Sequence, residues 1–584
     1  MIARIADYTV SPLALGTRAN YRCVKEGRTS LCLHEGWGGL PEPFVASVMD
    51  GGTLARACEE TGISLTQHTR FEQMAILAAA RALQGTGIRA DSPRLLFVVA
   101  TTKGNVELLD GRCAAAYPSG RWKVTEAARQ VTRWFHNPND PLVVCNACIS
   151  GLSAQLEAVR ALRSGRYDQV AVVGADVLSP FIVSGFQSLK ALSDSRCRPF
   201  DEDRTGLNLG EAAACIVYAR LEDAGREEER WCLKAGTVRN DAWHLSGPSK
   251  TAEGAYRALR QVAGRCGRNK LAFVSLHGTA TMFNDEMEAV ALDRAGMGNV
   301  PAFGLKGYIG HTMGAAGVVE TLISMEALED GTVPATKGFE SLGVSRKVSV
   351  SAQSRPAHGT AFLKMMSGFG GGNAALLFGK ETCGGQTAVE TACPATVTVT
   401  HTVRLTPHEA VVDGQKVPVE LRERLLPDAL YYTHIKDYPK FHKMDPLSKL
   451  GFVASELLLE AEAREEGVTR FAECEDRAVV LVGRTASVCA DQAYQQTISH
   501  AGDYYPSPSA FIYTLPNIVT GEIAIRNRWH GETVYLAQPS SEGVETLLRQ
   551  ALRSPGTRSV LGGWINVDDA EHFEAEMCIL IANH

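Results

Sequence analysis

The chain alternates between two kinds of apolar segment. Residues 69–83 are rich in alanine and repeat apolar residues at helical spacing. Residues 94–102 instead form a short, continuous apolar run with polar ends, which is typical of a strand buried in a parallel sheet. The alternation predicts an α/β protein with parallel strands and crossover helices.

The same pattern surrounds two cysteines. Strand-like PLVVCNAC is followed by helix-like SGLSAQLEAVRALRSG and strand-like DQVAVVGADV, which predicts a βαβ unit. Cys148 then lies at a strand-to-helix junction, where helical N–H groups are unpaired and the helix dipole is positive. Such a position favours the nucleophilic thiolate. Taken alone, a structural cysteine is the better interpretation, because free cysteine often packs as a small hydrophobe.

A second copy of the pattern lies near the C-terminus. LSKLGFVASELLLEAE precedes RAVVLVGRT, and TVYLAQPSSEG leads into VETLLRQALRSPGTRSVLGGWINV. The tetrapeptide ALRS occurs at 161–164 and again at 551–554, each time before a turn and an apolar strand. We interpret residues 401–584 as a diverged duplicate of about the first 180 to 220 residues, with Ser540 near the position of Cys148.

Composition excludes several classes of protein. The formal net charge of −6 over 584 residues gives no basic footprint for nucleic acid. The N-terminus lacks signal-peptide features, and no apolar run is long enough to span a membrane. The 15 cysteines are scattered, and Cys145 and Cys148 form an isolated CxxC, so a metal site is not expected and a reducing cytoplasm fits best.

Two histidines occupy junctions similar to that of Cys148. His277 follows an apolar strand in SLHGTATMFNDEMEAVAL, and His311 lies in the glycine-rich LKGYIGHTMGAAGVVE. Open α/β sheets keep their sites at such strand ends. Either histidine alone is better explained as a structural residue, but together with Cys148, Lys306 and the glycine-rich 366–379 they indicate one site.

These motifs resemble the β-ketoacyl-acyl-carrier-protein synthases of the thiolase superfamily, of the elongating Cys-His-His type. The resemblance rests on NACISG, HGTATMFNDEME, KGYIGHTMGAAG and SGFGGGNAALLF, together with residues 174–214, all in the order of the family. It covers about residues 1–380. It implies the duplicated, layered αβαβα thiolase fold, and it makes the surplus C-terminal segment an additional thiolase-like half-domain.

The resemblance also divides the chain into units. Residues 1–225 become an N-terminal half with the nucleophile, and residues 226–380 a C-terminal half with both histidine motifs. Residues 381–400, rich in Gly, Thr and Ala, are expected to be a linker. Residues 401–584 become a degenerate, noncatalytic half, similar to the partners that shape the acyl tunnel in some polyketide and polyene systems.

The resemblance assigns roles to the site residues. Cys148 takes an acyl chain from a carrier-protein thioester, and His277 and His311 hold the malonyl thioester carbonyl during loss of carbon dioxide. The backbone N–H groups of Cys148 and Phe369 form the oxyanion hole, with Phe369 as a gate. A soft nucleophile that is also a good leaving group, and neutral imidazoles that donate hydrogen bonds, suit this chemistry.

Supporting residues and partners follow from the same resemblance. Lys306 and Glu288 are expected to form a charge pair that orients the loop of the second histidine, and Thr279 and Thr281 to bind the phosphopantetheine arm. A structural salt bridge and solvent-facing turn threonines are the alternatives. The expected partners are an acyl carrier protein and a second copy in a homodimer, with a second ketosynthase-like subunit as a further candidate. No metal or organic cofactor is expected.

Other functions stay open at this stage. A thiolase acting on coenzyme A thioesters needs a second cysteine near the C-terminal glycine motif, which here reads MSGFGGGN. A cysteine peptidase does not explain two histidine-glycine motifs. A noncatalytic chain-length partner conflicts with intact Cys148, His277 and His311. The acyl primer, the chain length and the pathway (fatty acid, polyene or other polyketide) do not follow from the sequence.

Overall fold

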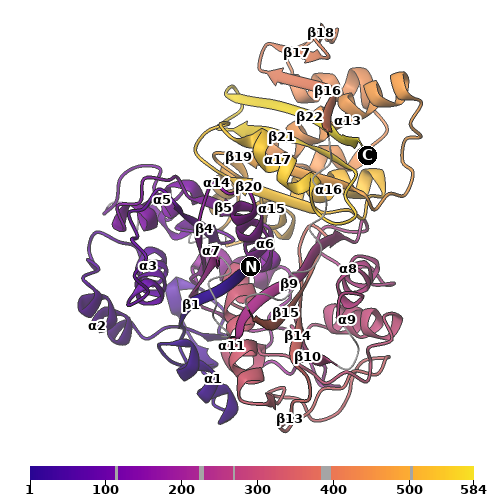
Figure 1. Ribbon diagram of the computed structural model, residues 1–584. Coiled ribbons are helices and arrows are strands. Elements are labelled where there is room, and N and C mark those ends of the chain that lie inside the picture. Colours follow the sequence, from indigo (N-terminus) through magenta and orange to yellow (C-terminus); the bar gives the residue numbers. More distant parts are fainter. Residues whose placement is uncertain (112–115, 222–228, 267–269, 383–395, 500–503, 584) are drawn as a thin grey trace.

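The computed structural model describes residues 1–111, 116–221, 229–266, 270–382, 396–499 and 504–583 (Figure 1). We call residues 1–382 the first part and residues 396–583 the appended segment. Among these described residues, none of the helices combines the length and the apolar character needed to cross a bilayer. The expected boundary at 225/226 lies outside the described residues.

The first part begins with one half of the layered fold. Its helices and strands are β1 (Ile2–Val10), α1 (Thr17–Lys25), β2 (Cys32–His34), β3 (Phe44–Ser47), α2 (Gly51–Thr61), α3 (Arg70–Leu83), β4 (Leu95–Ala100), α5 (Val124–Trp134), β5 (Leu142–Val144), α6 (Ser150–Arg163), β6 (Gln169–Asp176), α7 (Pro180–Ser188), β7 (Leu209–Gly210), β8 (Ala212–Arg220) and β9 (Glu229–Asn240). The sequence pattern predicted α3, β4, β5, α6 and β6.

The second half supplies the other sheet. Its elements are α8 (Glu253–Ala263), β10 (Leu271–Ser275), α9 (Met282–Arg294), β11 (Ala302–Phe303), α10 (Lys306–Ile309), α11 (Ala316–Glu329), β12 (Thr332–Val333), β13 (Arg355–Pro356), β14 (Ala361–Gly368) and β15 (Gly372–Thr382). The sheet has the order β11-β10-β14-β15-β9, so β9, although it directly follows β8 in the chain, belongs to this second half. Helices α6 and α11 pack between the two sheets, α3 covers the outer face of the first sheet and α8 that of the second. This is the expected αβαβα arrangement.

The appended segment forms a third half. Its elements are β16 (Thr396–Thr406), β17 (Glu409–Val412), β18 (Gln415–Lys416), α12 (Leu426–Leu430), α13 (Pro446–Glu466), β19 (Arg477–Gly483), α14 (Val488–Ile498), α15 (Pro508–Tyr513), α16 (Ile518–Asn527), β20 (Thr533–Ala537), α17 (Val544–Leu552), β21 (Ser559–Val567) and β22 (Phe573–Asn583). Of the expected linker, residues 383–395 lie outside the described residues. Residues 396–400 are not linker but the start of β16.

The first sheet runs through both parts of the chain. Within the described residues it has the order β1-β8-β6-β4-β5-β20-β19-β21-β22-β16-β17-β18. The strand order β1-β8-β6-β4-β5 of the first part thus recurs in the appended segment as β16-β22-β21-β19-β20, running in from the opposite edge of the sheet; we call this arrangement the mirrored sheet. Helix α3 packs on β1, β8 and β6, and α13 packs on their counterparts β16, β22 and β21. Figure 1 shows the appended segment continuing the sheet of the first part.

The two copies meet at the edge strand of the first part. Strand β5 pairs antiparallel with β20, with Val143 opposite Ala537 and Val144 opposite Leu536. The Cys145 N–H extends this contact by donating to the Tyr535 carbonyl at 3.1 Å. The homodimer expected from the resemblance needs this same edge. Since the chain itself occupies the edge, it is not available to a second copy.

Candidate active site

The structure brings Cys148, His277 and His311 together. Cys148 lies in a short 3₁₀ turn, Ala147–Ile149, between β5 and α6. His277 follows β10, and His311 follows the short helix α10. The Cys148 Sγ atom and one ring nitrogen of each histidine all lie within 4.8 Å of one another.

The thiol faces one imidazole directly. The distance from Cys148 Sγ to His311 Nε2 is 3.0 Å. The rings of the two histidines lie nearly perpendicular, with centroids 5.1 Å apart. Nδ1 of His311 is buried and has no hydrogen-bond partner among the described residues, so either ring nitrogen of His311 can carry the proton.

The expected preference for a resting thiolate is wrong. Burial raises the pKa of the Cys148 thiol to about 12, and the positive charge of Lys306 offsets only part of this effect. Removing the thiolate from water costs more free energy than the helix terminus and the lysine supply by stabilising its charge. The resting nucleophile is therefore a neutral thiol that gives up its proton as it reacts, with His311 Nε2 in reach as acceptor.

Lys306 fixes the tautomer of His277. The Lys306 ammonium lies 3.1 Å from His277 Nδ1 and donates to the His277 carbonyl at 2.6 Å. An ammonium can only donate hydrogen bonds, so His277 Nδ1 is the acceptor and Nε2 carries the proton. Burial, and then the positive charge of Lys306, hold the pKa of His277 well below its usual range. His277 is a neutral hydrogen-bond donor.

The charge partner of Lys306 is Glu320, not Glu288 as expected. Lys306 Nζ lies 2.9 Å from Glu320 Oε1, and Lys364 Nζ lies 2.6 Å from Glu320 Oε2. All three side chains are fully buried. Burial opposes ionisation of Glu320, but the two ammonium groups outweigh it and lower the pKa of the carboxyl group. One carboxylate thus holds two buried cations behind the histidines.

Glu288 holds the His277 loop by another route. Its two carboxylate oxygens accept hydrogen bonds from the N–H groups of His277 and Gly278, each at 2.7 Å. Burial, and then the charge of Asp285, raise the pKa of Glu288 to about 7. Glu288 positions the loop, whereas the ion pair that we predicted for it does not form.

A metal ion does not fit this site. The thiol and the two imidazoles could offer three ligand atoms. Beside burial, however, the charges of Lys306 and Lys364 lower the pKa of His311. The same charges disfavour a divalent cation at this position.

Family comparisons agree with the geometry. The profile described as "Beta-ketoacyl synthase, N-terminal domain" matches residues 57–224, and "Beta-ketoacyl synthase, C-terminal domain" matches residues 232–340. The tetracenomycin polyketide synthase ketoacyl synthase alpha subunit of Streptomyces glaucescens is 30% identical over 413 residues, covering 64% of this chain and 96% of the relative. The chain belongs to the β-ketoacyl synthase family.

Other β-ketoacyl synthases show the same relationship. The 3-oxoacyl-[acyl-carrier-protein] synthase 2 of Vibrio cholerae is 30% identical over 344 residues, covering 53% of this chain and 82% of the relative. Among solved structures, the PfaC keto synthase-chain length factor matches with a TM-score of 0.77 and 14% identity, covering 100% of this chain and 78% of that one. The ketosynthase ApeO in complex with its chain length factor ApeC, from Xenorhabdus doucetiae, matches with a TM-score of 0.56, 22% identity, and 65% and 98% coverage. These structures show the fold, and the match to the first of them extends over the appended segment of this chain.

In this β-ketoacyl synthase, the backbone beside Phe369, the expected gate residue, lies against the nucleophile. A Cβ atom on Gly368, at the end of β14, would lie only 3.2 Å from the backbone nitrogen of Cys148. The close approach brings the backbone before Phe369 next to the turn of Cys148. Phe369 itself is half-buried. Thr279 is buried and its hydroxyl lies 2.9 Å from that of the less buried Thr281, at the start of α9.

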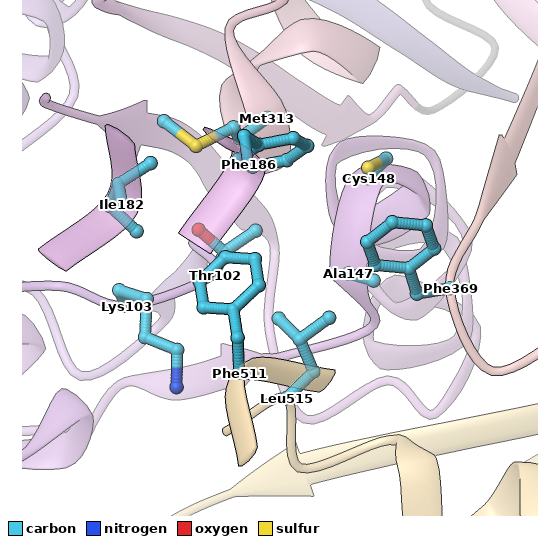
Figure 2. A pocket seen from close by; sticks show the side chains of 10 residues that line it. All are labelled: Thr102, Lys103, Ala147, Cys148, Ile182, Phe186, Met313, Phe369, Phe511 and Leu515. Carbon is cyan, nitrogen blue, oxygen red and sulfur yellow. The ribbon is translucent and has the colours of Figure 1, made fainter. Parts of the chain in front are cut away.

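An apolar pocket adjoins Cys148 (Figure 2). It leaves a cavity of about 20 Å³, which is room for about one water molecule. An acyl chain therefore enters only if side chains move. The pocket is lined by Thr102, Lys103, Ala147, Cys148, Ile182, Phe186, Met313, Phe369, Phe511 and Leu515.

Two of the lining residues come from the appended segment. Phe511 packs so closely on α7 that a Cβ atom on Gly185 would lie 2.2 Å from its ring. Its ring also lies 5.6 Å from that of Phe186, which stacks on the gate residue Phe369 at 6.3 Å. Sequence reasoning missed Phe511 and Leu515, because contacts with pocket residues that are distant in the sequence leave no local pattern.

A buried ion pair ties the two parts together beside the pocket. Lys103 Nζ lies 2.5 Å from Asp491 Oδ1 and also donates to the Thr514 carbonyl. Its side chain lies next to Thr102 and the Phe511 segment in Figure 2, and these contacts hold its ammonium group. The appended segment thus neutralises a cation of the first part while it closes the pocket.

Proposed function

We propose that the chain is a condensing enzyme that catalyses decarboxylative Claisen condensation between a malonyl group on acyl carrier protein and an acyl group on Cys148. The observation that carries the proposal is the Cys148 thiol 3.0 Å from His311 Nε2, with a second neutral imidazole, His277, beside it. One base suffices to activate a thiol. A second donor is needed where negative charge develops on another carbonyl.

The first half-reaction loads the acyl group. Sγ of Cys148 attacks the carbonyl carbon of the acyl-carrier thioester while its proton passes to His311 Nε2. The Cys148 and Phe369 N–H groups stabilise the oxyanion of the tetrahedral intermediate. The bond to the carrier sulfur breaks, and the leaving thiolate takes the proton from His311. Cys148 then carries the acyl chain in the apolar pocket.

The second half-reaction makes the carbon–carbon bond. The malonyl thioester carbonyl accepts a hydrogen bond from His277 Nε2–H, the proton that Lys306 keeps on that nitrogen. Loss of carbon dioxide leaves an enolate, whose carbon attacks the acyl-Cys148 carbonyl. The C–S bond breaks, and the released Cys148 thiolate takes up one proton from solvent, so a β-ketoacyl thioester leaves on the carrier and the neutral thiol is restored.

Both substrates reach the site on a phosphopantetheine arm, and the residues need no further cofactor. We assign Thr279 and Thr281 to the arm, since both hydroxyls lie in the His277 loop. The product serves chain elongation in fatty acid, polyene or other polyketide synthesis.

The test follows carbon from malonyl-carrier protein. The chain is supplied with acyl-carrier and malonyl-carrier protein, and both carbon dioxide and the β-ketoacyl product are measured by mass spectrometry. We expect both, and expect neither condensation product nor acyl-enzyme from Cys148→Ala. Condensation of coenzyme A thioesters without carbon dioxide release would establish a thiolase instead. Absence of any turnover would leave a noncatalytic partner of another synthase.

We further propose that the appended segment is noncatalytic and limits the acyl pocket. Phe511 blocks the space next to Gly185 and Phe186, at the end of the cavity formed by the appended segment. Phe511→Ala should let longer acyl chains load on Cys148, although a Phe-to-Ala change in a core costs about 3 to 5 kcal/mol of stability. Phe471→Ala is the matched control, because Phe471 is 38% exposed in the same segment. An unchanged chain-length profile for folded Phe511→Ala would contradict this role.

The same segment takes the place of a second subunit at β5. Native mass spectrometry should then give a single chain of 62.9 kDa. A stable species of twice this mass would contradict the expectation that the chain is monomeric once this edge is occupied.

A further inference from the structure

Asn517 of the appended segment lies against the backbone of Phe369. Its side-chain amide group donates a hydrogen bond to the Phe369 carbonyl at 2.8 Å. The asparagine is only 3% exposed, so water does not compete freely for this bond. The two residues are 148 positions apart in the sequence. The bond therefore forms only because the appended segment docks on the first part.

The Asn517 side chain does not serve its own helix. Asn517 is the N-cap residue of α16, a position where asparagine ordinarily accepts a hydrogen bond from an N–H group of the first turn. Its side chain makes no such capping bond. Its Oδ1 atom is buried and has no hydrogen-bond partner in the part of the chain that the structure describes. Since a buried unpaired acceptor is costly and rare, the side chain is oriented by its bond to Phe369 and not by the needs of α16.

Helix α16 approaches this backbone more closely than ordinary side chains allow. A Cβ atom on Gly521, one turn further along α16, would lie 2.6 Å from the Gly370 carbonyl oxygen. A Cβ atom on Gly370 would in turn lie 2.6 Å from Nδ2 of Asn517. Gly370 also has a φ of 86°, in the left-handed region that favours glycine. The two glycines thus let the start of α16 reach the peptide that follows Phe369.

The backbone of Phe369 is held on both sides. Gly368, immediately before it, ends β14 and pairs with Gly372 of β15. On the other side, Asn517 holds the Phe369 carbonyl. Because both neighbouring peptide groups are fixed, rotation about the Phe369 backbone bonds is restricted. The direction of the Phe369 N–H group is therefore set by the strand on one side and by the appended segment on the other.

A second contact from the appended segment supports the same turn. Nδ2 of Asn240, at the end of β9, donates to the Gly370 carbonyl at 2.8 Å and to the Thr533 hydroxyl at 3.0 Å. Nδ1 of His530 lies 2.9 Å from the Asn240 carbonyl. Thr533 and His530 both belong to the appended segment. The turn after Phe369 is thus fixed by residues of both parts of the chain.

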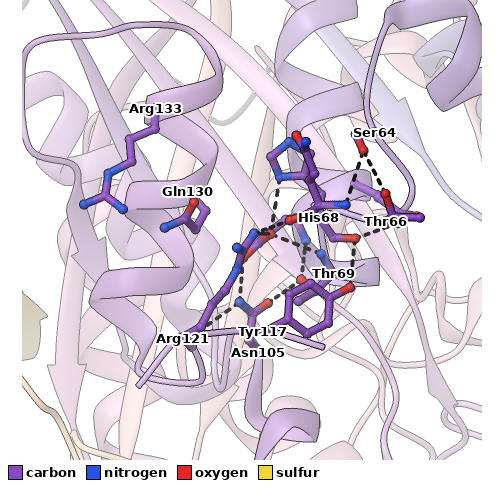
Figure 3. A network of polar contacts seen from close by, with 12 residues as sticks. Ser64, Thr66, His68, Thr69, Asn105, Tyr117, Arg121, Gln130 and Arg133 are labelled. Carbon is purple, nitrogen blue, oxygen red and sulfur yellow. Dashed lines mark hydrogen bonds and ion pairs between the residues drawn. The ribbon is translucent and has the colours of Figure 1, made fainter. Parts of the chain in front are cut away.

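The corresponding helix of the first part has a different environment (Figure 3). Helix α5 precedes β5 as α16 precedes β20 in the mirrored sheet. Before α5, Arg121 Nε lies 2.9 Å from Glu72 Oε1, and Asn105 Nδ2 donates to the Arg121 carbonyl at 3.1 Å. Lys123, the N-cap residue of α5, lies 4.0 Å from Asp568 of the appended segment. Of these two helix starts, that of α16 is the one that reaches the backbone beside the nucleophile.

We propose that Asn517 is a positioning residue of the active site, because its bond to the Phe369 carbonyl fixes the Phe369 N–H group as the second donor of the oxyanion hole. This inference rests on the proposed function, in which that N–H group stabilises the oxyanion at the acyl carbonyl. A donor that is already oriented needs no reorganisation when negative charge develops, which makes an oxyanion hole effective. The appended segment then supports the chemistry without supplying a group that touches the substrate.

The test compares two reactions of one thiol in the unchanged chain and in Asn517→Ala. Acyl loading from an acyl-carrier thioester passes through an oxyanion, whereas alkylation of Cys148 by iodoacetamide displaces iodide and forms no oxyanion. Both rates are measured at Cys148 by mass spectrometry with peptide mapping. Complete loss of an oxyanion-hole donor costs about 100- to 1000-fold in rate, and a loosened donor loses part of this. We therefore expect the ratio of the loading rate to the alkylation rate to fall about tenfold or more.

Asn527→Ala is the matched control. Asn527 lies at the other end of α16, is 1% exposed and donates to the Ile523 carbonyl at 3.0 Å within the helix. Its removal should lower stability and leave the ratio of the two rates unchanged. Asn517→Leu, which fills the space but has no donor, is the second variant if Asn517→Ala does not fold. It should show the same fall in the ratio.

An unchanged ratio in a folded Asn517 variant would overturn the proposal. Equal falls in both rates would indicate damage to the fold, and equal rises would mean that Asn517 only restricts access to Cys148. The same fall in Asn527→Ala would show that any weakening of α16 is enough, which also overturns a specific role. Failure of the proposed function is distinguishable, because the unchanged chain would then be alkylated at Cys148 but would not load an acyl group.

Discussion

Two strand-to-helix junctions of this molecule are related by the mirrored sheet and differ in chemistry. Between β5 and α6, Cys148 lies in a half-buried turn against the gate, beside two histidines from the second sheet's side of the fold. Between β20 and α17, Ser540 lies in an exposed turn. The appended segment repeats one sheet, and in its described residues it has no counterpart of β10, β11 or β14. A nucleophile thus becomes useful only where the second sheet delivers its histidines.

The largest effect is expected behind the histidines of the catalytic junction. Glu320→Gln leaves Lys306 and Lys364 buried without their carboxylate, which should cost about 3 to 5 kcal/mol of unfolding free energy. Glu288→Gln is the comparison, because its amide group can still accept one of the two backbone N–H groups and its loss leaves no buried cation unpaired, so we expect a smaller loss. Denaturant unfolding measures both. A larger loss of unfolding free energy for Glu288→Gln than for Glu320→Gln would favour Glu288 as the charge partner of Lys306, as first expected from the sequence.

His277 gives the next largest effect. Removing its Nε2–H donor should slow decarboxylation by about 100- to 1000-fold, as for oxyanion-hole donors. Acyl loading, which uses His311, should persist in His277→Ala. Single-turnover assays of each half-reaction separate the two steps. Equal losses in both would contradict the division of labour between the histidines.

The pH dependence of alkylation distinguishes a thiol with a raised pKa from an activated cysteine, whose pKa is lowered. Because the Cys148 pKa is raised to about 12, the thiolate fraction rises with pH throughout the neutral range. Alkylation by iodoacetamide should accelerate about tenfold per pH unit between pH 7 and 9, since the thiolate is the nucleophile. Rates measured on the native chain and on Cys148→Ala isolate this site. A plateau below pH 7 would mean a lowered pKa.

The smallest effect is expected at the second junction. Ser540→Cys places a thiol where the duplicate lacks one, but no histidine pair accompanies it. We therefore expect no acyl adduct at residue 540 and unchanged stability. An adduct there that depends on carrier protein would show that the strand-to-helix junction alone suffices.

Local patterns predicted the elements but not their long-range pairing. Helix α3 and strand β4 followed from apolar spacing, because buried strands and amphipathic helices differ in period. The duplicate was predicted from the order of its elements and confirmed in the mirrored sheet. Its docking on β5 was not predicted, because edge pairing has no local signal, and the homodimer stays a prediction.

The sequence predicted the reacting groups of the site but not the residues that support them. Cys148, His277 and His311 lie in glycine-rich motifs at strand ends, so their convergence was predictable. Glu320 lies inside the apolar helix α11, where the sequence gives no sign that it faces two lysines. The resting state of Cys148 depended on burial, which the position at a helix start does not reveal. Phe511 and Asp491 reach the pocket only through tertiary contacts.

The most direct test of the central claim compares the two junctions in one measurement. The native chain, Cys148→Ala and Ser540→Cys are incubated with acyl-carrier thioesters and analysed by intact-protein mass spectrometry with peptide mapping. We predict one acyl group on the native chain, located at Cys148, the same single adduct on Ser540→Cys, and none on Cys148→Ala. An adduct that survives in Cys148→Ala, or no adduct on the native chain with any donor, would contradict the assignment of the nucleophile.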